Sequence, residues 1–157
     1  MAEMTTYEQL EQSIEIDATP AQVWALVSDV SRMARWSPQV VRSTVKGGVV
    51  EQGATFKNLN RQGLLFWPTN AKVVRFEPHR DFAFKVKENR TIWSFELAET
   101  ASGGTLLTQR REVPQGISKV SLVMTKVVLG GVDGFTETLK RGMGETLAKV
   151  KAEAEQV

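Results

Sequence analysis

The C-terminal stretch Ile117–Val157 decides the fold, and it reads ISKVSLVMTKVVLGGVDGFTETLKRGMGETLAKVKAEAEQV. Apolar residues recur along it every three or four positions, with an interruption at Gly130-Gly131. On the two sides of these glycines the apolar residues are Ile117, Val120, Met124, Val127 and Val128, then Phe135, Leu139, Met143, Leu147, Val150 and Ala154. This spacing places side chains on one face of an α-helix. The stretch therefore predicts a long helix whose apolar face needs a covering layer.

The residues before this stretch alternate between apolar and polar in about seven segments, which is typical of β-strands with one covered face. The predicted strands are Tyr7–Asp17, Gln39–Lys46, Ala54–Arg61, Trp67–Phe76, Phe82–Lys87, Trp93–Leu97 and Thr105–Val113. Two short helices follow the first strand. Thr19 can cap the first, which begins at Pro20 and ends near Asp29, and Ser37-Pro38 ends the second. We predict one α+β helix-grip domain, residues 1–157, with a seven-stranded antiparallel sheet wrapped around the long C-terminal helix.

Composition limits the classes of function. The chain has 157 residues and a net charge of +2, and it has no block of basic and aromatic residues that would indicate nucleic-acid binding. It has no cysteine and one histidine, which excludes thiolate chemistry and a multi-histidine metal site, and we expect no cofactor. The polar segment Met1–Gln12 is unlike a signal peptide, and no apolar run is long enough to span a membrane. We expect a cytoplasmic protein without stable membrane insertion.

Several short motifs, spread over nearly the whole chain, carry a resemblance to a known superfamily. They are Ile16-Asp17-Ala18-Thr19-Pro20 with Val23-Trp24 and Asp29, Trp36-Ser37-Pro38, Gly53-Ala54-Thr55-Phe56, Asn60-Arg61-Gln62-Gly63, Glu77-Pro78-His79-Arg80 with Phe82-Ala83-Phe84, Gly104-Thr105, and Arg141-Gly142-Met143-Gly144 with Thr146-Leu147. The chain resembles the START/Bet v 1-like (SRPBCC) superfamily, and more closely its bacterial polyketide cyclase/dehydrase-like proteins. The resemblance implies a helix-grip fold. It implies less about function, because the superfamily includes lipid carriers, ligand receptors, co-chaperones and cyclases.

A sheet curved around a helix leaves a concave space, where we expect a ligand site. Lys and Arg mark the outer face of the strands, so the alternate residues point inward, and Val41 is one of them. The predicted ligand-binding residues are Phe56, Asn58, Asn60, Trp67, Thr69, Phe82, Phe84, Trp93, Phe95, Gln109 and Arg111 on the strands, with Val120, Met124, Val127 and Phe135 on the helix.

Most of the apolar members of this set are better explained as ordinary core residues than as ligand contacts. The polar members are more informative, because burying an unpaired amide costs about 1–3 kcal/mol. They should hydrogen-bond one another, water or a ligand, unless a bulge reverses the strand phase or they lie at the open end of the sheet.

Acid–base catalysis needs a carboxylate or a histidine in the inward set, and none is predicted there. Glu96 and Glu112 fall on the outer face, and His79 lies in a turn between Pro78 and Arg80, where we expect it to be exposed. No phosphate-binding loop, dinucleotide fingerprint or nucleophile elbow occurs. No catalytic residue and no metal ligand is therefore assigned.

These features favour a carrier or sensor, a monomer or weak homodimer, that binds a small hydrophobic molecule such as a lipid or polyketide. Two alternatives stay open. A cofactor-independent polyketide cyclase or dehydratase would use Arg111, Asn58 and Asn60 as hydrogen-bond donors to enolates. A protein-interaction module would resemble the co-chaperone members of the superfamily.

Glycines interrupt the helical pattern at two places. Gly130-Gly131 indicates a break between two helices, and the alternative is a hinge beside the mouth of the cavity. Gly142 and Gly144 are expected to allow close packing of the helix.

Overall fold

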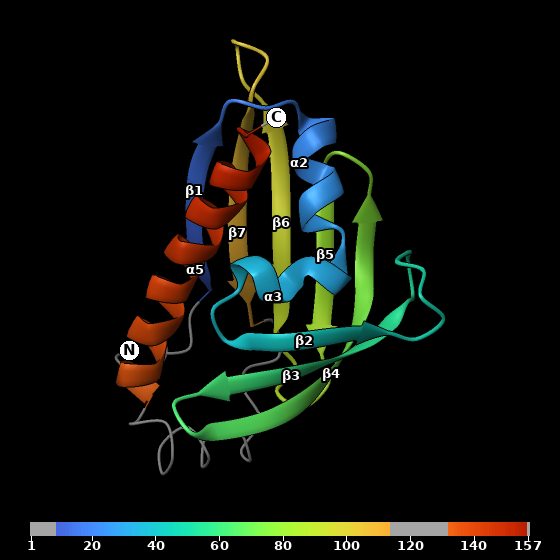
Figure 1. Cartoon of the computed structure of the whole chain (residues 1–157), viewed down its shortest axis with the longest axis vertical. Helices are drawn as coiled ribbons and strands as arrows, with labels where there is room; N and C mark the ends of the chain where they lie inside the picture. Colours follow the sequence, from blue (N-terminus) through green and yellow to red (C-terminus); the bar gives the residue numbers. More distant parts are fainter. Residues whose placement is uncertain (1–8, 114–131, 157) are drawn as a thin grey trace.

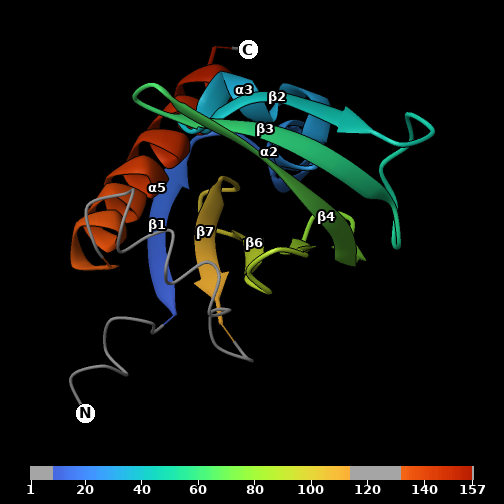
Figure 2. The ribbon, with the colours of Figure 1, turned by 90° about the horizontal axis from the view of Figure 1, so that it is seen from below.

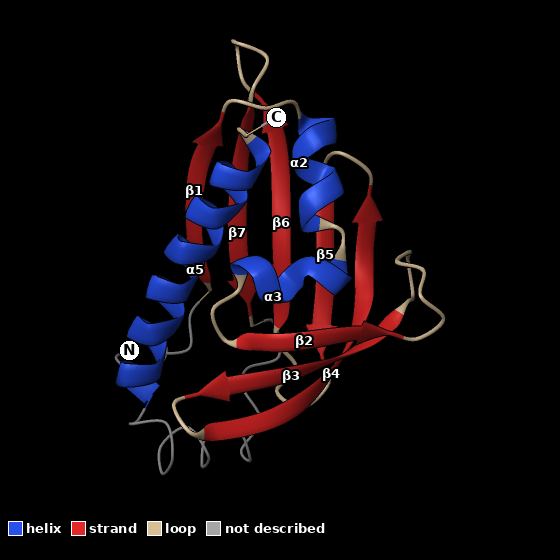
Figure 3. Ribbon diagram, viewed as in Figure 1, coloured by secondary structure: helices blue, strands red, loops and turns tan. Residues whose placement is uncertain are grey.

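The computed structural model describes residues 9–113 and 132–156 and shows an antiparallel sheet with helices on one face (Figure 1). The elements are β1 (Leu10–Ile16), α2 (Pro20–Val27), the 3₁₀ helix η1 (Val30–Arg32), α3 (Met33–Trp36), β2 (Val40–Val45), β3 (Thr55–Gln62), β4 (Leu65–Glu77), β5 (Asp81–Val86), β6 (Ile92–Glu99), β7 (Thr105–Glu112) and α5 (Val132–Ala154). The seven strands pair in the order β1-β7-β6-β5-β4-β3-β2 (Figure 3). The predicted helix-grip fold is confirmed.

The first helix begins where the sequence predicts. The Thr19 hydroxyl accepts a hydrogen bond from the backbone N–H of Gln22, and the Gln22 side-chain oxygen accepts one from the N–H of Thr19. Pro20 occupies the first position of α2, where its missing N–H breaks no helical hydrogen bond. The helix ends at Val27, slightly before the expected end, and the carboxylate of Asp29 caps η1 instead.

The β2–β4 end of the sheet curls toward the helices, so that β2 packs against η1 and α3 (Figure 2). The prediction that Val41 points inward is wrong. A β-bulge pairs Val40 with Asn60 and Arg42 with Leu59, which leaves Val41 without a partner opposite and 46% exposed. One extra residue in a strand reverses the side-chain phase, and a period of two read from the sequence does not reveal it.

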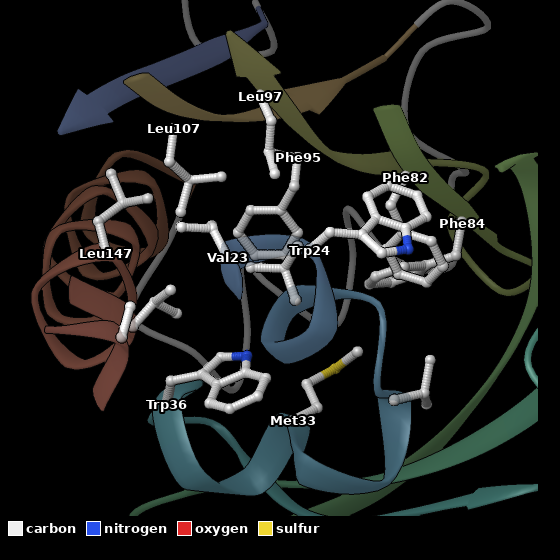
Figure 4. Packing of buried hydrophobic residues seen from close by; sticks show 14 of the residues in the cluster. Val23, Trp24, Met33, Trp36, Phe82, Phe84, Phe95, Leu97, Leu107 and Leu147 are labelled. Atoms are coloured by element: carbon white, nitrogen blue, oxygen red, sulfur yellow. The ribbon is translucent and has the colours of Figure 1, made fainter. Parts of the chain in front are cut away.

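The hydrophobic core lies between the sheet and helices α2, α3 and α5. Figure 4 shows Val23, Trp24, Met33, Trp36, Phe82, Phe84, Phe95, Leu97, Leu107 and Leu147 packed together there. Trp24 meets the ring of Phe82 edge-on at 6.1 Å between centroids. Each such side chain contributes about 1.5–3 kcal/mol when fully buried, so this cluster holds the helices against the sheet.

The C-terminal part of the predicted apolar stripe is confirmed. Within α5 the structure buries Leu139, Met143, Leu147, Val150 and Ala154. The predicted helical residues Ile117–Leu129 and the Gly130-Gly131 break lie outside the described residues. None of the helices in the described parts of the chain is long and apolar enough to cross a membrane.

The two glycines of α5 lie where the helix approaches its neighbours closely, as predicted. A Cβ atom on Gly142 would be 3.3 Å from Cγ of Pro38, and one on Gly144 would be 3.3 Å from Oε1 of Gln12. The Gln12 side chain also donates a hydrogen bond to the backbone oxygen of Lys140, at 2.8 Å. The Gln12 contacts place α5 against β1, and the Pro38 contact places it against the segment between α3 and β2.

Candidate functional site

The concave face of the sheet has two ends of different chemistry. At one end, which we call the apolar end, Leu107 on β7 is aligned with Ile14 on β1 and Leu97 on β6. Helix α2 and the C-terminal half of α5 cover this end, and Leu107 is fully buried. The other end, which we call the polar end, carries the inward residues Asn58, Asn60, Trp67, Thr69, Trp93, Gln109 and Arg111.

Two polar residues of β7 follow Leu107 at the next inward positions. Gln109 lies opposite Phe95, and Arg111 lies between Leu10 on β1 and Trp93 on β6. Their side chains are 7% and 3% exposed, respectively. The alternation in the sequence therefore placed both residues correctly on the concave face, and both are buried about as deeply as the core.

The chemistry of this pair is unusual for a buried position. Within the residues that the structure describes, Oε1 of Gln109 has no hydrogen-bond partner, which costs about 1–3 kcal/mol. Burial lowers the pKa of the Arg111 guanidinium, whose N–H groups are hydrogen-bond donors. An acceptor and a cation thus lie two residues apart on one strand, and they could hold a ligand that carries a hydroxyl and a carbonyl or carboxylate.

The polar residues of β3 and β4 form a second group. The Asn60 side-chain N–H donates to Oγ1 of Thr69 at 2.9 Å and to the backbone oxygen of Trp67 at 3.2 Å. Asn58 accepts a hydrogen bond from the hydroxyl of Ser43 and donates to the sulfur of Met33 at 3.5 Å. The structure therefore brings Asn60 and Thr69 together, which is one of the outcomes left open for the inward polar residues. It satisfies Asn58 through two residues that the sequence did not indicate.

The predicted aromatic residues divide between core and site. Phe56, Phe82, Phe84 and Phe95 belong to the hydrophobic core, where Phe56 and Phe84 stack edge-on at 5.1 Å. Trp67 is only partly buried.

Trp93 is also partly buried, and it packs against a separate small cluster of Leu10, Leu139 and Met143. This cluster lies beside Arg111, because Leu10 and Trp93 are its two cross-strand neighbours. Leu10 and Met143 are site neighbours that the inward-residue prediction missed. The apolar stripe of α5 was the available signal for Met143.

The carboxylates lie on the outer face, as predicted. Glu112 accepts a hydrogen bond at 2.7 Å from Arg75 and one at 2.9 Å from Ser94, and the Arg75 hydrogen bond is the largest cause that lowers the pKa of Glu112. Glu96 pairs with Arg110 at 3.0 Å. Arg111 is thus not held on the surface by Glu112.

His79 is exposed in its turn, with a backbone φ of 69°. The buried polar residues of the described chain are Asn58, Asn60, Thr91, Ser94, Thr105, Thr108, Gln109, Arg111 and Thr146, which include no carboxylate and no imidazole. Within residues 9–113 and 132–156, no three His, Asp or Glu side chains are grouped to hold a metal ion.

Four predicted ligand-binding residues belong to the C-terminal stretch. Val120, Met124 and Val127 lie outside the described residues. Phe135 is part of α5, but its side chain is not among those described. These four assignments stay predictions.

Comparisons with known proteins agree with this architecture. A profile of the family described as "Polyketide cyclase / dehydrase and lipid transport" matches residues 8–155. A polyketide-cyclase-like protein of Corynebacterium glutamicum is 26% identical over 94% of this chain and 91% of its own, with a TM-score of 0.64. No curated protein sequence matches the chain.

Two more distant structures share the fold. The Zhui aromatase/cyclase of Streptomyces sp. R1128 is 14% identical over 95% of this chain and 94% of its own, with a TM-score of 0.76. The Aha1 dimer of Colwellia psychrerythraea is 16% identical over 94% of this chain and 96% of its own, with a TM-score of 0.63. At these identities the likeness shows the fold alone.

Proposed function

Because the chain belongs to the polyketide cyclase/dehydrase and lipid transport family, we propose that it binds a small hydrophobic molecule, such as a lipid or polyketide, at the polar end of the sheet. The observation that carries this proposal is the buried Oε1 atom of Gln109, which has no hydrogen-bond partner among the described residues. A ligand hydroxyl would donate to this oxygen and remove the cost of burying it.

The surrounding residues suit the rest of such a ligand. Trp67 and Trp93 are large and partly exposed, so each offers an apolar surface that a ligand can cover. Arg111 would donate hydrogen bonds to a carbonyl or carboxylate, and a charged donor makes the stronger kind of hydrogen bond. A mostly apolar site with a few polar groups that set the orientation is the usual composition of a small-molecule site.

Binding without reaction is favoured over catalysis by the inward polar residues. Those that the structure describes are amides, hydroxyls and one guanidinium, and none is a carboxylate or an imidazole, the side chains that most often act as general bases. A cyclase would have to rely on Arg111, Asn58 and Asn60 to stabilise an enolate, and the Asn58 amide is already engaged by Ser43 and Met33. We therefore keep a carrier or sensor as the proposal.

The test has two parts. Native mass spectrometry of the full chain purified from its own host, followed by organic extraction, should reveal a bound apolar molecule. Titration with the fluorescent fatty acid cis-parinaric acid then compares Arg111→Gln with Arg110→Gln. The two residues are adjacent on β7 and face opposite sides, and Arg110 pairs with Glu11 and Glu96 on the outer face.

A lost hydrogen bond to a charged group costs about 1.5–3 kcal/mol, so Arg111→Gln should weaken fatty-acid binding by about 10-fold or more. Arg110→Gln should leave the affinity unchanged. Equal affinities of all three proteins, with circular dichroism showing that each is folded, would contradict the proposed site.

A further inference from the structure

The outer face of strands β2–β5 carries a groove of about 890 Å³ whose charged lining residues are all basic. They are Lys46, Lys57, Lys72, Lys85, Lys87 and Arg90. The whole chain has a net charge of only +2, so the remaining residues are net negative. The groove therefore carries an excess of positive charge that the rest of the chain does not have.

Strand register explains why these side chains lie together. Lys57 on β3 pairs with Asn70 on β4, and the neighbouring outer position of β4, Lys72, pairs directly with Lys85 on β5. Residues directly opposite in an antiparallel sheet have Cβ atoms about 4.5–5.5 Å apart, so their charges add to one field. The carboxylate of Glu88 at the edge of this face accepts hydrogen bonds from the backbone and side chain of Asn70.

Elsewhere on the outer face of the sheet, arginine side chains are paired with carboxylates. Arg75 pairs with Asp81 and Glu112, and Arg110 pairs with Glu11 and Glu96. Among the described residues, by contrast, no ion pair involves Lys57, Lys72 or Lys87. The groove therefore has a positive electrostatic potential, whereas carboxylates neutralise the charges of Arg75 and Arg110.

An exposed apolar tip continues this face. Along β3, Arg61 lies four residues beyond Lys57, about 13 Å along the strand. Its guanidinium lies over the ring of Phe66, 5.3 Å from the centroid. Phe66 is 50% exposed, and Leu64 in the turn between β3 and β4 is 93% exposed. Figure 1 shows β3 and β4 as a long hairpin at the bottom of the view, with its turn at the left.

We propose that this face docks the protein on an anionic lipid bilayer. The groove lysines would face the lipid phosphates, and the Leu64 and Phe66 side chains would enter the headgroup region. A basic surface joined to a protruding apolar tip is the composition of peripheral membrane contacts. An exposed leucine gives no favourable contact to a nucleic-acid backbone, which is why the bilayer is favoured over a nucleic acid. The inference goes beyond the proposed function and does not depend on a bound ligand.

The expected strength of membrane binding follows from the number of lysines in the groove. Each lysine near an anionic membrane surface contributes about 1 kcal/mol, or about fivefold in the partition coefficient. Binding should therefore be reversible, and it should be nearly abolished at about 1 M salt, where the Debye length is about 3 Å.

Vesicle co-sedimentation of the full chain tests the charge requirement, using phosphatidylcholine vesicles with and without phosphatidylserine. Binding is expected only to the anionic vesicles. The double variant Lys57→Gln/Lys72→Gln should bind about 25-fold more weakly, at about fivefold for each charge. The control Arg80→Gln/Lys149→Gln removes the same charge from exposed residues elsewhere and should bind like the wild type. An equal loss in both double variants, or equal binding to both kinds of vesicle, would overturn the proposal.

A fluorescent probe tests the tip. The chain has no cysteine, so Leu64→Cys and Arg80→Cys each provide one attachment point for an environment-sensitive fluorophore. Anionic vesicles should shift the emission to the blue at position 64 and leave it unchanged at position 80. A shift at neither position would overturn the insertion of the tip, and so would tighter binding of a duplex DNA oligonucleotide than of the vesicles at equal salt.

Discussion

The apolar and polar ends of the concave face are built on the same strands and are buried to nearly the same depth. Leu107 at the apolar end is fully buried, and Gln109 and Arg111 further along β7 are 7% and 3% exposed. Burial at the apolar end stabilises the fold. Burial at the polar end costs free energy, because an acceptor lacks a partner among the described residues and a cation is desolvated. Depth of burial therefore does not distinguish core from site; the chemistry of the buried atoms does.

The largest effect is expected from Phe82→Ala in the hydrophobic core beneath α2. Phe82 is fully buried and contacts the rings of Trp24, Phe76 and Phe84. Its removal should lower the free energy of unfolding by about 3–5 kcal/mol, measured by urea titration. Trp67→Ala at the polar end should cost much less, because Trp67 is partly exposed. Equal losses in the two variants would remove the distinction between the core and the polar end.

A smaller loss of stability is expected from a substitution on the outer face, where ion pairs with carboxylates stabilise the fold. Arg75→Met should lower the free energy of unfolding by about 1 kcal/mol at neutral pH. The Arg75 hydrogen bond lowers the pKa of Glu112, so the ionised carboxylate stabilises the fold above its unfolded pKa of about 4.3. This contribution is lost as the pH falls through the lowered folded pKa.

Asp81 has the opposite effect on the pH dependence of stability. Burial is the largest cause acting on its pKa and raises it despite the contact with Arg75, so protonation of Asp81 at low pH favours the folded state. The difference between wild type and Arg75→Met should therefore shrink when urea unfolding is repeated below about pH 4. A difference that stays constant with pH would show that Arg75 contributes by packing alone.

The smallest effects are expected where α5 approaches the rest of the chain. Alanine in place of a helical glycine gains up to about 1 kcal/mol. At Gly142 the new Cβ would crowd the ring of Pro38, which offsets the gain. At Gly144 it would meet only the end of the Gln12 side chain, which can move. Gly144→Ala should therefore have a higher melting temperature than Gly142→Ala, and the reverse order would place the rigid contact at Gln12.

Much of the fold could be predicted from the sequence, because each element has a local signal. Thr19-Pro20 marks the start of α2, and the spacing of Leu139, Met143 and Leu147 marks the buried face of α5. The bulge at Val41 has no such signal, because it depends on how β2 pairs with β3. It moved one predicted inward residue to the surface.

The candidate site was predictable in its residue types and faces, and less so in its contacts. Alternation placed Gln109 and Arg111 on the concave face. The sequence does not give side-chain distances, and these decide which polar atoms are paired. Asn58 is paired with Ser43 and Met33, whereas Oε1 of Gln109 lacks a partner among the described residues. The outer groove was missed because its lysines come from separate strands that only the register brings together.

Gln109→Met tests whether the polar end is kept for binding at the expense of stability. The control is Thr108→Val, at the adjacent residue of β7. Thr108 is also buried, but its hydroxyl has a partner, the Ser13 hydroxyl at 2.8 Å. Each variant is measured for its free energy of unfolding in urea and for its affinity for cis-parinaric acid.

Gln109→Met should leave the free energy of unfolding unchanged or raise it, and it should weaken fatty-acid binding. Thr108→Val should instead lose about 1 kcal/mol of stability and keep its affinity. A Gln109→Met variant that is clearly less stable than the wild type, and binds the fatty acid as tightly, would show that Gln109 stabilises the fold and does not contact the ligand.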